Sequence, residues 1–227
     1  MTKSCIARFL YDLLSEFSAQ FTKAGKFLLQ IGEHGKTDGS NDTKNVNQAA
    51  GLAVYAPTKE LFVADGYGNR RVIVFDSETG AYKRHWGAYG KPPSDDKTPA
   101  YDPAQPPAQQ FGRPVHCVRF SKDGLVYVCD RINDRVQMFK KDGTFVAEAF
   151  FEKNTRLNGS VSELVFSADR DQKFIYMADG VNNELRIIER ASNEHSRASA
   201  GPGASPASST SCTTSQWTSG ATFTRLK

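Results

Sequence analysis

Short runs of apolar residues alternate with turn-forming residues along most of the chain, a pattern typical of β-strands joined by tight turns. In each unit, a run that ends in Asp is followed by a second run with Arg at or near its start. Three copies align: Leu61–Asp65 with Arg71–Phe75, Val126–Asp130 with Arg135–Phe139 and, more weakly, Ile175–Asp179 with Leu185–Ile188. Self-similarity of this kind indicates a repeat architecture.

A fourth, partial copy stands at the front of the chain, where Gln20–Leu28 matches Met138–Val146. The unit is roughly 45 to 50 residues long, judged from the equivalent positions Phe21, Phe75, Phe139 and Ile188. The longest interval between copies holds a Pro-rich insertion, Lys91–Gln110.

Turn signals such as Ser121–Gly124 and Lys141–Gly143 divide each unit into as many as four strands. A four-stranded meander repeated at this period predicts a blade of a β-propeller. We therefore expect an all-β, incomplete propeller over residues 17–194. It would hold the end of one blade, two full blades at about Ala50–Gly90 and Val115–Phe151, and most of a fourth.

The Asp and Asn residues between paired strands are expected to be structural. In Asp65–Asn69, Asp130–Arg135 and Asp179–Asn183 they can cap backbone groups and tolerate left-handed dihedral angles. We interpret them as turn residues.

The repeat resembles the NHL repeat, whose pattern of Ala-Asp, Asn, Arg-Val-x-Val-Phe and a later Gly-x-Phe is matched by Val63–Phe75 and Val128–Phe145. The resemblance covers roughly Phe17–Arg190. It implies the six-bladed design common among NHL propellers, of which this chain would hold about four partial or full blades, too few to close a ring.

A closer resemblance is to the peptidyl-hydroxyglycine amidating lyases, which are zinc enzymes on a propeller of this type. The family's catalytic tyrosine corresponds to Tyr67 in the turn Asp65–Arg71, and its catalytic arginine to Arg131 after Cys129-Asp130. One of its zinc-binding histidines corresponds to His116, with one extra residue after Pro114. The resemblance implies that the Tyr and Arg act on the hydroxyl carbon of a peptidyl-hydroxyglycine while zinc binds a substrate oxygen. Zinc and calcium are the metals it implies for a complete parent protein.

The chain departs from that family in its histidines. A catalytic zinc needs three protein ligands and an open position, and the lyases draw three histidines from the inner strands of three blades. Of the four histidines here, His85 falls on an expected outer strand, and His34 and His195 fall in expected loops. Only His116 is placed to bind a metal, so we expect no zinc or other cofactor in this chain. Tyr67 and Arg131 then either line a central pocket or are ordinary turn and rim residues.

The four cysteines contain no Cys-x-x-Cys pair and no zinc-finger spacing. Cys117 and Cys129 flank the turn at Lys122–Gly124 and would lie nearly opposite each other on adjacent strands. A disulfide there requires an oxidising compartment, and we expect two buried free thiols.

The two ends of the chain do not follow the repeat. Residues 1–16 place Ile6, Phe9, Leu10, Leu13 and Leu14 at helical spacing, which predicts a short amphipathic helix. After Glu194 no acidic residue occurs and Ser and Thr dominate, so residues 195–227 are expected to be a disordered tail.

A change of reading frame near His195 is a sharper hypothesis for this tail. Reading one base back, the codons of Ser199–Thr210 permit a repeat-like blade opening that contains a histidine.

The net charge of +4 comes from 29 basic and 25 acidic residues spread along the chain, and this spread argues against nucleic acid as a partner. No apolar run is long enough to span a membrane, and Arg8 and Asp12 interrupt what a signal peptide would need. The sequence does not indicate the cellular compartment. Two functions remain: a propeller scaffold that binds a protein or a small ligand, and a remnant of a zinc-dependent amidating-lyase-like enzyme.

Overall fold

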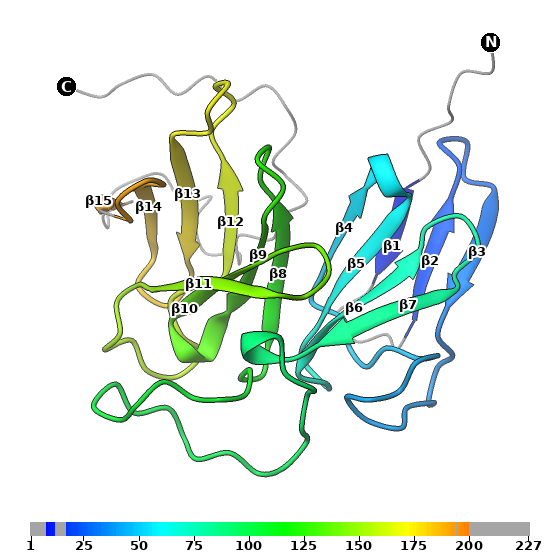
Figure 1. The fold of residues 1–227 in the computed structure, drawn as a ribbon, viewed down its shortest axis with the longest axis horizontal. Helices are drawn as coiled ribbons and strands as arrows, with labels where there is room; N and C mark the ends of the chain where they lie inside the picture. The colour runs from blue at the N-terminus through cyan, green and yellow to red at the C-terminus, as the bar shows by residue number, and fades with distance from the viewer. Residues whose placement is uncertain (1–7, 12–16, 194, 200–227) are drawn as a thin grey trace.

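The computed structural model describes residues 8–11, 17–193 and 195–199, which form four antiparallel sheets (Figure 1). We number these sheets as blades 1 to 4. Blade 1 contains β1 (Arg8–Tyr11), β2 (Ser18–Phe21) and β3 (Phe27–Ile31). Blade 2 contains β4 (Gly51–Tyr55), β5 (Glu60–Asp65), β6 (Arg71–Asp76) and β7 (Tyr82–Trp86). Blade 3 contains β8 (Val115–Phe120), β9 (Val126–Asp130), β10 (Arg135–Phe139) and β11 (Phe145–Phe150). Blade 4 contains β12 (Glu163–Phe166), β13 (Phe174–Asp179), β14 (Glu184–Glu189) and β15 (His195–Ser199).

The strands of each blade pair in sequence order, as a meander requires, and three short 3-10 helices lie in the connections. These helices are η1 (Ala56–Thr58), η2 (Ala88–Gly90) and η3 (Arg131–Asn133). In Figure 1 the blades follow one another as a fan, with blade 4 at the left and blade 1 at the right. The first strand of blade 3, β8, contacts the first strands β4 and β12 of the neighbouring blades, so these three are the inner strands. This arrangement confirms the predicted all-β, incomplete propeller.

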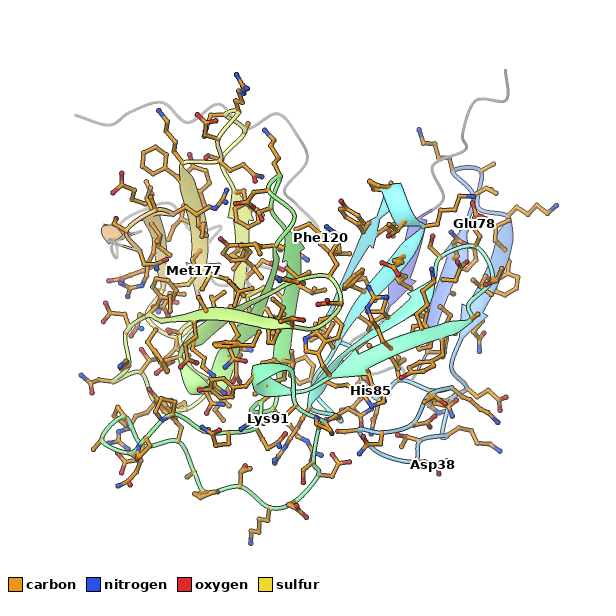
Figure 2. The ribbon with its side chains drawn as sticks, viewed as in Figure 1. Asp38, Glu78, His85, Lys91, Phe120 and Met177 are labelled. Atoms are coloured by element: carbon orange, nitrogen blue, oxygen red, sulfur yellow. A yellow bond between two sulfur atoms is a disulfide. The ribbon has the colours of Figure 1, made fainter. Side chains whose placement is uncertain are left out.

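The core consists of three apolar layers, one between each pair of neighbouring blades. Because successive side chains of a strand point to opposite faces, Leu61 and Val63 face blade 1 while Phe62 and Ala64 face blade 3. Figure 2 shows side chains filling these spaces, with Met177 in the layer between blades 3 and 4. Strands covered on both faces explain why their sequences are nearly continuous apolar runs.

Each of blades 2, 3 and 4 contains the same buried polar cluster at the turn between its second and third strands. The Asp that ends the second strand pairs with an Arg on the third, at 2.8 Å for Asp65–Arg71, 2.7 Å for Asp130–Arg135 and 2.9 Å for Asp179–Arg186. An Asn of the turn donates to the same carboxylate in all three blades. The Asp and Asn residues are therefore turn residues, as predicted, and they also hold a buried arginine.

These arginines fix the connections between blades. Arg71 donates to the backbone carbonyls of Ser40, Asp42 and Asn45 in the segment that leads from blade 1 to blade 2. Arg135 donates to the carbonyl of Gln110, which precedes blade 3. In blades 2 and 3 the recurring Arg thus forms hydrogen bonds with the segment that leads into its own blade.

The prediction of a helix at the N-terminus is wrong where the structure describes that segment. Arg8–Tyr11 form β1, which pairs with β2 along its whole length. A strand there gains inter-strand hydrogen bonds with β2, and this pairing outweighs the weak helical preference of a four-residue segment. Residues 1–7 and 12–16, the rest of that prediction, lie outside the described residues.

The expected boundary of the tail also needs correction. His195–Ser199 form β15, the outer strand of blade 4, in register with β14 from Ile188 opposite His195 to Glu184 opposite Ser199. The open edge of β14 supplies backbone partners regardless of side-chain composition, so a Ser-rich segment can pair there. Residues 200–227 lie outside the described residues, and the reading-frame hypothesis stays a prediction.

The expectation of free thiols is contradicted as well. Cys117 on β8 and Cys129 on β9 are directly paired in register and form a disulfide, with their Cα atoms 4.8 Å apart. Direct cross-strand pairing places the two cysteines close enough to form the bond.

None of the described helices is long and apolar enough to cross a membrane.

Candidate functional site

His116 is the extra residue of a β-bulge in the inner strand of blade 3. Val115 pairs with Asp130 and Cys117 with Cys129, so His116 has no partner residue on β9. A bulge of this kind redirects a side chain and is frequent beside functional sites. The bulge accounts for the one extra residue after Pro114 that the sequence contains.

Both ring nitrogens of His116 have hydrogen-bond partners. Nδ1 lies 2.5 Å from the backbone oxygen of Ser162, at the start of blade 4, and Nε2 lies 3.2 Å from the hydroxyl of Tyr67, from blade 2. A carbonyl oxygen can only accept, so Nδ1 carries the proton and Nε2 accepts from Tyr67. The rings of Tyr67 and His116 meet edge to face with centroids 5.8 Å apart.

The environment of His116 keeps its imidazole neutral. Burial, followed by the charge of Arg131, lowers the pKa of His116 to about 4. A neutral ring whose Nδ1–H is bound to a carbonyl presents its Nε2 lone pair as an acceptor or a metal ligand.

Gly66 allows the turn that contains Tyr67 to approach the start of β8 closely. A Cβ atom at Gly66 would lie 2.1 Å from the backbone oxygen of Val115, so no larger residue fits without displacing one of the two segments. The backbone N–H of Tyr67 donates to Gln48 in the preceding connection. These contacts hold the phenol beside His116.

Arg131 joins the site from η3, at the end of β9. Its backbone N–H donates to the oxygen of Pro114 at 3.4 Å, close to the bulge. The Nε atom of its guanidinium is buried and has no partner among the described residues. The charge of Arg131 disfavours the protonated form of His116.

The three residues predicted from the sequence therefore gather beside the inner strand of blade 3. Tyr67 comes from blade 2, and His116 and Arg131 come from blade 3. The other described histidines lie elsewhere. His85 bonds Tyr82 at 2.9 Å on the outer strand β7, where Figure 2 labels it, and His34 is exposed in a connection. His195 begins the outer strand β15 and does not lie in a loop as expected.

The described residues do not fit a catalytic zinc. Among the side chains that the structure describes, no group of three His, Cys, Asp or Glu is placed to hold a metal. His116 could supply one ligand, and its Nε2 already accepts from Tyr67. A tetrahedral catalytic site needs two more protein ligands.

Two contributions to the site could not be identified from the sequence. The Ser162 carbonyl, which sets the His116 tautomer, is a backbone group from another blade. Arg119 on β8 forms a 2.5 Å ion pair with Glu163 on β12, and burial raises the pKa of that carboxyl group. Charged residues on expected inner strands were the only available signal for this pair.

Comparison with known proteins supports the fold more strongly than the activity. No known family model matches the chain. A stretch of 109 residues is 34% identical to peptidyl-glycine alpha-amidating monooxygenase B of Xenopus laevis. The aligned stretch covers 48% of this chain and 11% of that protein.

Among solved structures, virginiamycin B lyase from Staphylococcus aureus matches with a TM-score of 0.55 at 12% identity, over 90% of this chain and 55% of that one. The WD40 repeats of RRP9 match with a TM-score of 0.56 at 10% identity, over 85% and 47%. The fold is that of a β-propeller, and the chain spans about half the length of these solved propellers.

Proposed function

We propose that this chain is a ligand-binding part of an NHL-type propeller, with its ligand site formed by Tyr67, His116 and Arg131 beside the inner strands. The observation that carries this proposal is the meeting of these three residues from two blades, with His116 held neutral by its surroundings. Propellers commonly bind ligands near the axis, where loops and inner-strand ends converge.

The chemistry of the site fits a small ligand that ends in a carboxylate with a neighbouring hydroxyl. The Arg131 guanidinium, whose buried Nε lacks a partner, can bind a carboxylate in a charge-assisted contact. The Nε2 atom of His116 accepts a hydrogen bond, and a ligand hydroxyl can replace Tyr67 as its donor. An N-acyl-α-hydroxyglycine contains both groups, and similarity to the amphibian amidating protein supports this choice.

A second candidate function is amidating-lyase-like catalysis in a longer parent protein. The observation that favours it is that the counterparts of the family's catalytic Tyr and Arg lie beside the counterpart of a zinc-binding histidine. The described residues do not supply the rest of a zinc site. We therefore expect this chain alone to bind an α-hydroxyglycine without cleaving it.

The test is calorimetric titration of the full chain with N-benzoyl-α-hydroxyglycine, with benzamide as the neutral comparison. Arg131→Met should weaken binding about tenfold or more, since a charge-assisted contact contributes about 1.5 to 3 kcal/mol. Arg156→Met, at an exposed arginine of the connection between blades 3 and 4, is the matched control and should change nothing. Equal affinity in all three proteins would overturn the proposed site, and release of glyoxylate by this chain would favour the second candidate.

A further inference from the structure

A cavity of about 650 Å³ lies beneath the Pro-rich connection between blades 2 and 3. Figure 2 labels Lys91, where this connection begins. The walls come from the connection itself, from the Arg70 end of the blade 2 turn, from η3 and from the end of β11. This volume falls within the usual range for small-molecule sites.

The lining is apolar with a few basic groups. Four prolines of the connection form one wall, and Phe111, Ile132 and Phe150 add apolar surface. Arg70, Arg113 and Lys153 line the same space, against one acidic residue, Asp102. An apolar pocket with a few converging polar groups is the usual form of a ligand site, and here those groups favour an anion.

Arg70 carries this inference. The residue is 8% exposed, and its Nε atom is buried without a hydrogen-bond partner. Its guanidinium donates to the backbone oxygen of Asp96 at 3.0 Å, but no carboxylate of the described residues forms an ion pair with it. Burial, followed by the charge of Arg113, lowers the pKa of Arg70, and the charges of Asp95, Asp130 and Asp96 offset this only in part. A buried cation without a directly paired carboxylate is costly, and an anion bound in the cavity would reduce that cost.

The cavity is separate from the Tyr67–His116–Arg131 site. Within the turn after β5, Tyr67 contacts His116 whereas Arg70 lines the cavity. In η3, the backbone N–H of Arg131 donates to Pro114 beside the His116 bulge, whereas Ile132 and Asn133 line the cavity. Each turn thus contributes residues to both sites.

We propose that this cavity is a second ligand site, which binds a small amphiphilic oxyanion: a carboxylate or phosphate group attached to an apolar body. The oxyanion binds the guanidinium of Arg70, and a planar guanidinium suits the two oxygens of either group. The apolar body lies against the prolines and Phe111. Arg113, which also pairs with Asp95 at 2.9 Å, adds positive charge at the wall.

The experiment is saturation-transfer NMR on the full chain with four probes: 3-phenylpropanoate, phenyl phosphate, 3-phenylpropanamide and inorganic phosphate. We expect the two aromatic anions to bind at least tenfold more tightly than the amide or inorganic phosphate. The stronger of the two aromatic anions identifies the oxyanion class. Equal binding of the amide, or binding of inorganic phosphate alone, would overturn the proposal.

Variants assign the binding to this cavity. Arg70→Gln should abolish it, and Arg113→Gln and Lys153→Gln should each weaken it about three- to fivefold, which keeps the test valid if Arg70→Gln does not fold. Lys97→Gln is the matched control, because Lys97 is an exposed cation of the same connection that does not line the cavity. Loss of binding in Lys97→Gln would contradict the assignment.

Discussion

The turns of blades 3 and 4 contain the same buried frame and differ in what lies between its members. In blade 3 the frame is Asp130, Asn133 and Arg135, and in blade 4 it is Asp179, Asn182 and Arg186. Between Asp and Asn, blade 3 has Arg131 and Ile132, whereas blade 4 has Gly180 and Val181. The frame stabilises the turn of each blade, whereas the residues between its Asp and Asn differ from blade to blade.

In the frame, the cost of burying the two charged side chains opposes the gain from their ion pair. The side chains of Asp65 and Arg71 are fully buried, and burial raises the pKa of Asp65 against the opposing effect of Arg71. A buried ion pair contributes little net stability over apolar residues of the same shape, but losing one partner leaves an uncompensated charge. Each copy of the frame is therefore expected to be essential to the stability of its own blade.

The largest expected effect comes from removing one Asp of the frame. Asp130→Ala and Asp179→Ala should each lower the free energy of unfolding by about 3 to 5 kcal/mol, because each removes the acceptor that a buried Arg Nε–H and a buried Asn amide share. Glu148 and Glu152 still pair with the two arginines in these variants. Urea denaturation of the two variants measures this. Breaking the exposed Lys59–Glu78 pair with Lys59→Gln is the control and should have no measurable effect. A large loss for Asp130→Ala with none for Asp179→Ala would show that blade 3 is special and break the comparison.

The disulfide gives the next largest effect and is expected to distinguish blade 3 from blade 2. At the equivalent paired positions, blade 2 has Gly51 and Ala64. Reduction of Cys117–Cys129, whose cysteines are 12 residues apart, should cost about 3 kcal/mol through the added freedom of the unfolded chain.

Urea denaturation with and without dithiothreitol measures this cost. The Cys117→Ala/Cys129→Ala double variant should not respond to the reductant. Four reactive thiols in the unreduced, unfolded protein would contradict the bridge.

The neutral state of His116 predicts a smaller, pH-dependent effect. The folded state lowers its pKa to about 4 from an ordinary value of 6.5, so the unfolded chain takes up the proton first as the pH falls. Stability should therefore be unaffected by this group above about pH 6.5 and decrease between there and pH 4, by about 2 to 3 kcal/mol in all.

Comparison with His116→Gln isolates this contribution from the carboxylates that titrate in the same range. The difference in unfolding free energy between the two proteins should narrow as the pH falls from 7 to 4.5. Parallel curves would contradict a neutral, buried His116.

The repeat in the sequence was enough to predict the propeller, because period-2 apolar runs and turn residues act locally and recur. The candidate residues Tyr67, His116 and Arg131 came from the resemblance to the amidating lyases, through the motif in which each residue lies, and not from the repeat itself. The pairing of Arg8–Tyr11 and His195–Ser199 could not be predicted, since both segments pair with strand edges that only the folded sheet provides. The Ser162 carbonyl and the cavity at Arg70 depend on how separate segments pack, and no local pattern encodes that.

The most direct test of the account is the protonation state of His116 in the folded chain, because the proposed site depends on that ring. In a protein labelled with ¹⁵N-histidine, His116 should show the Nδ1–H tautomer at pH 7, with Nε2 as an unprotonated acceptor. Tyr67→Phe should shift the Nε2 resonance, whereas Tyr82→Phe, which breaks the exposed Tyr82–His85 contact, should leave it unchanged. An Nε2–H tautomer, an imidazolium at pH 7 or no response to Tyr67→Phe would contradict the account.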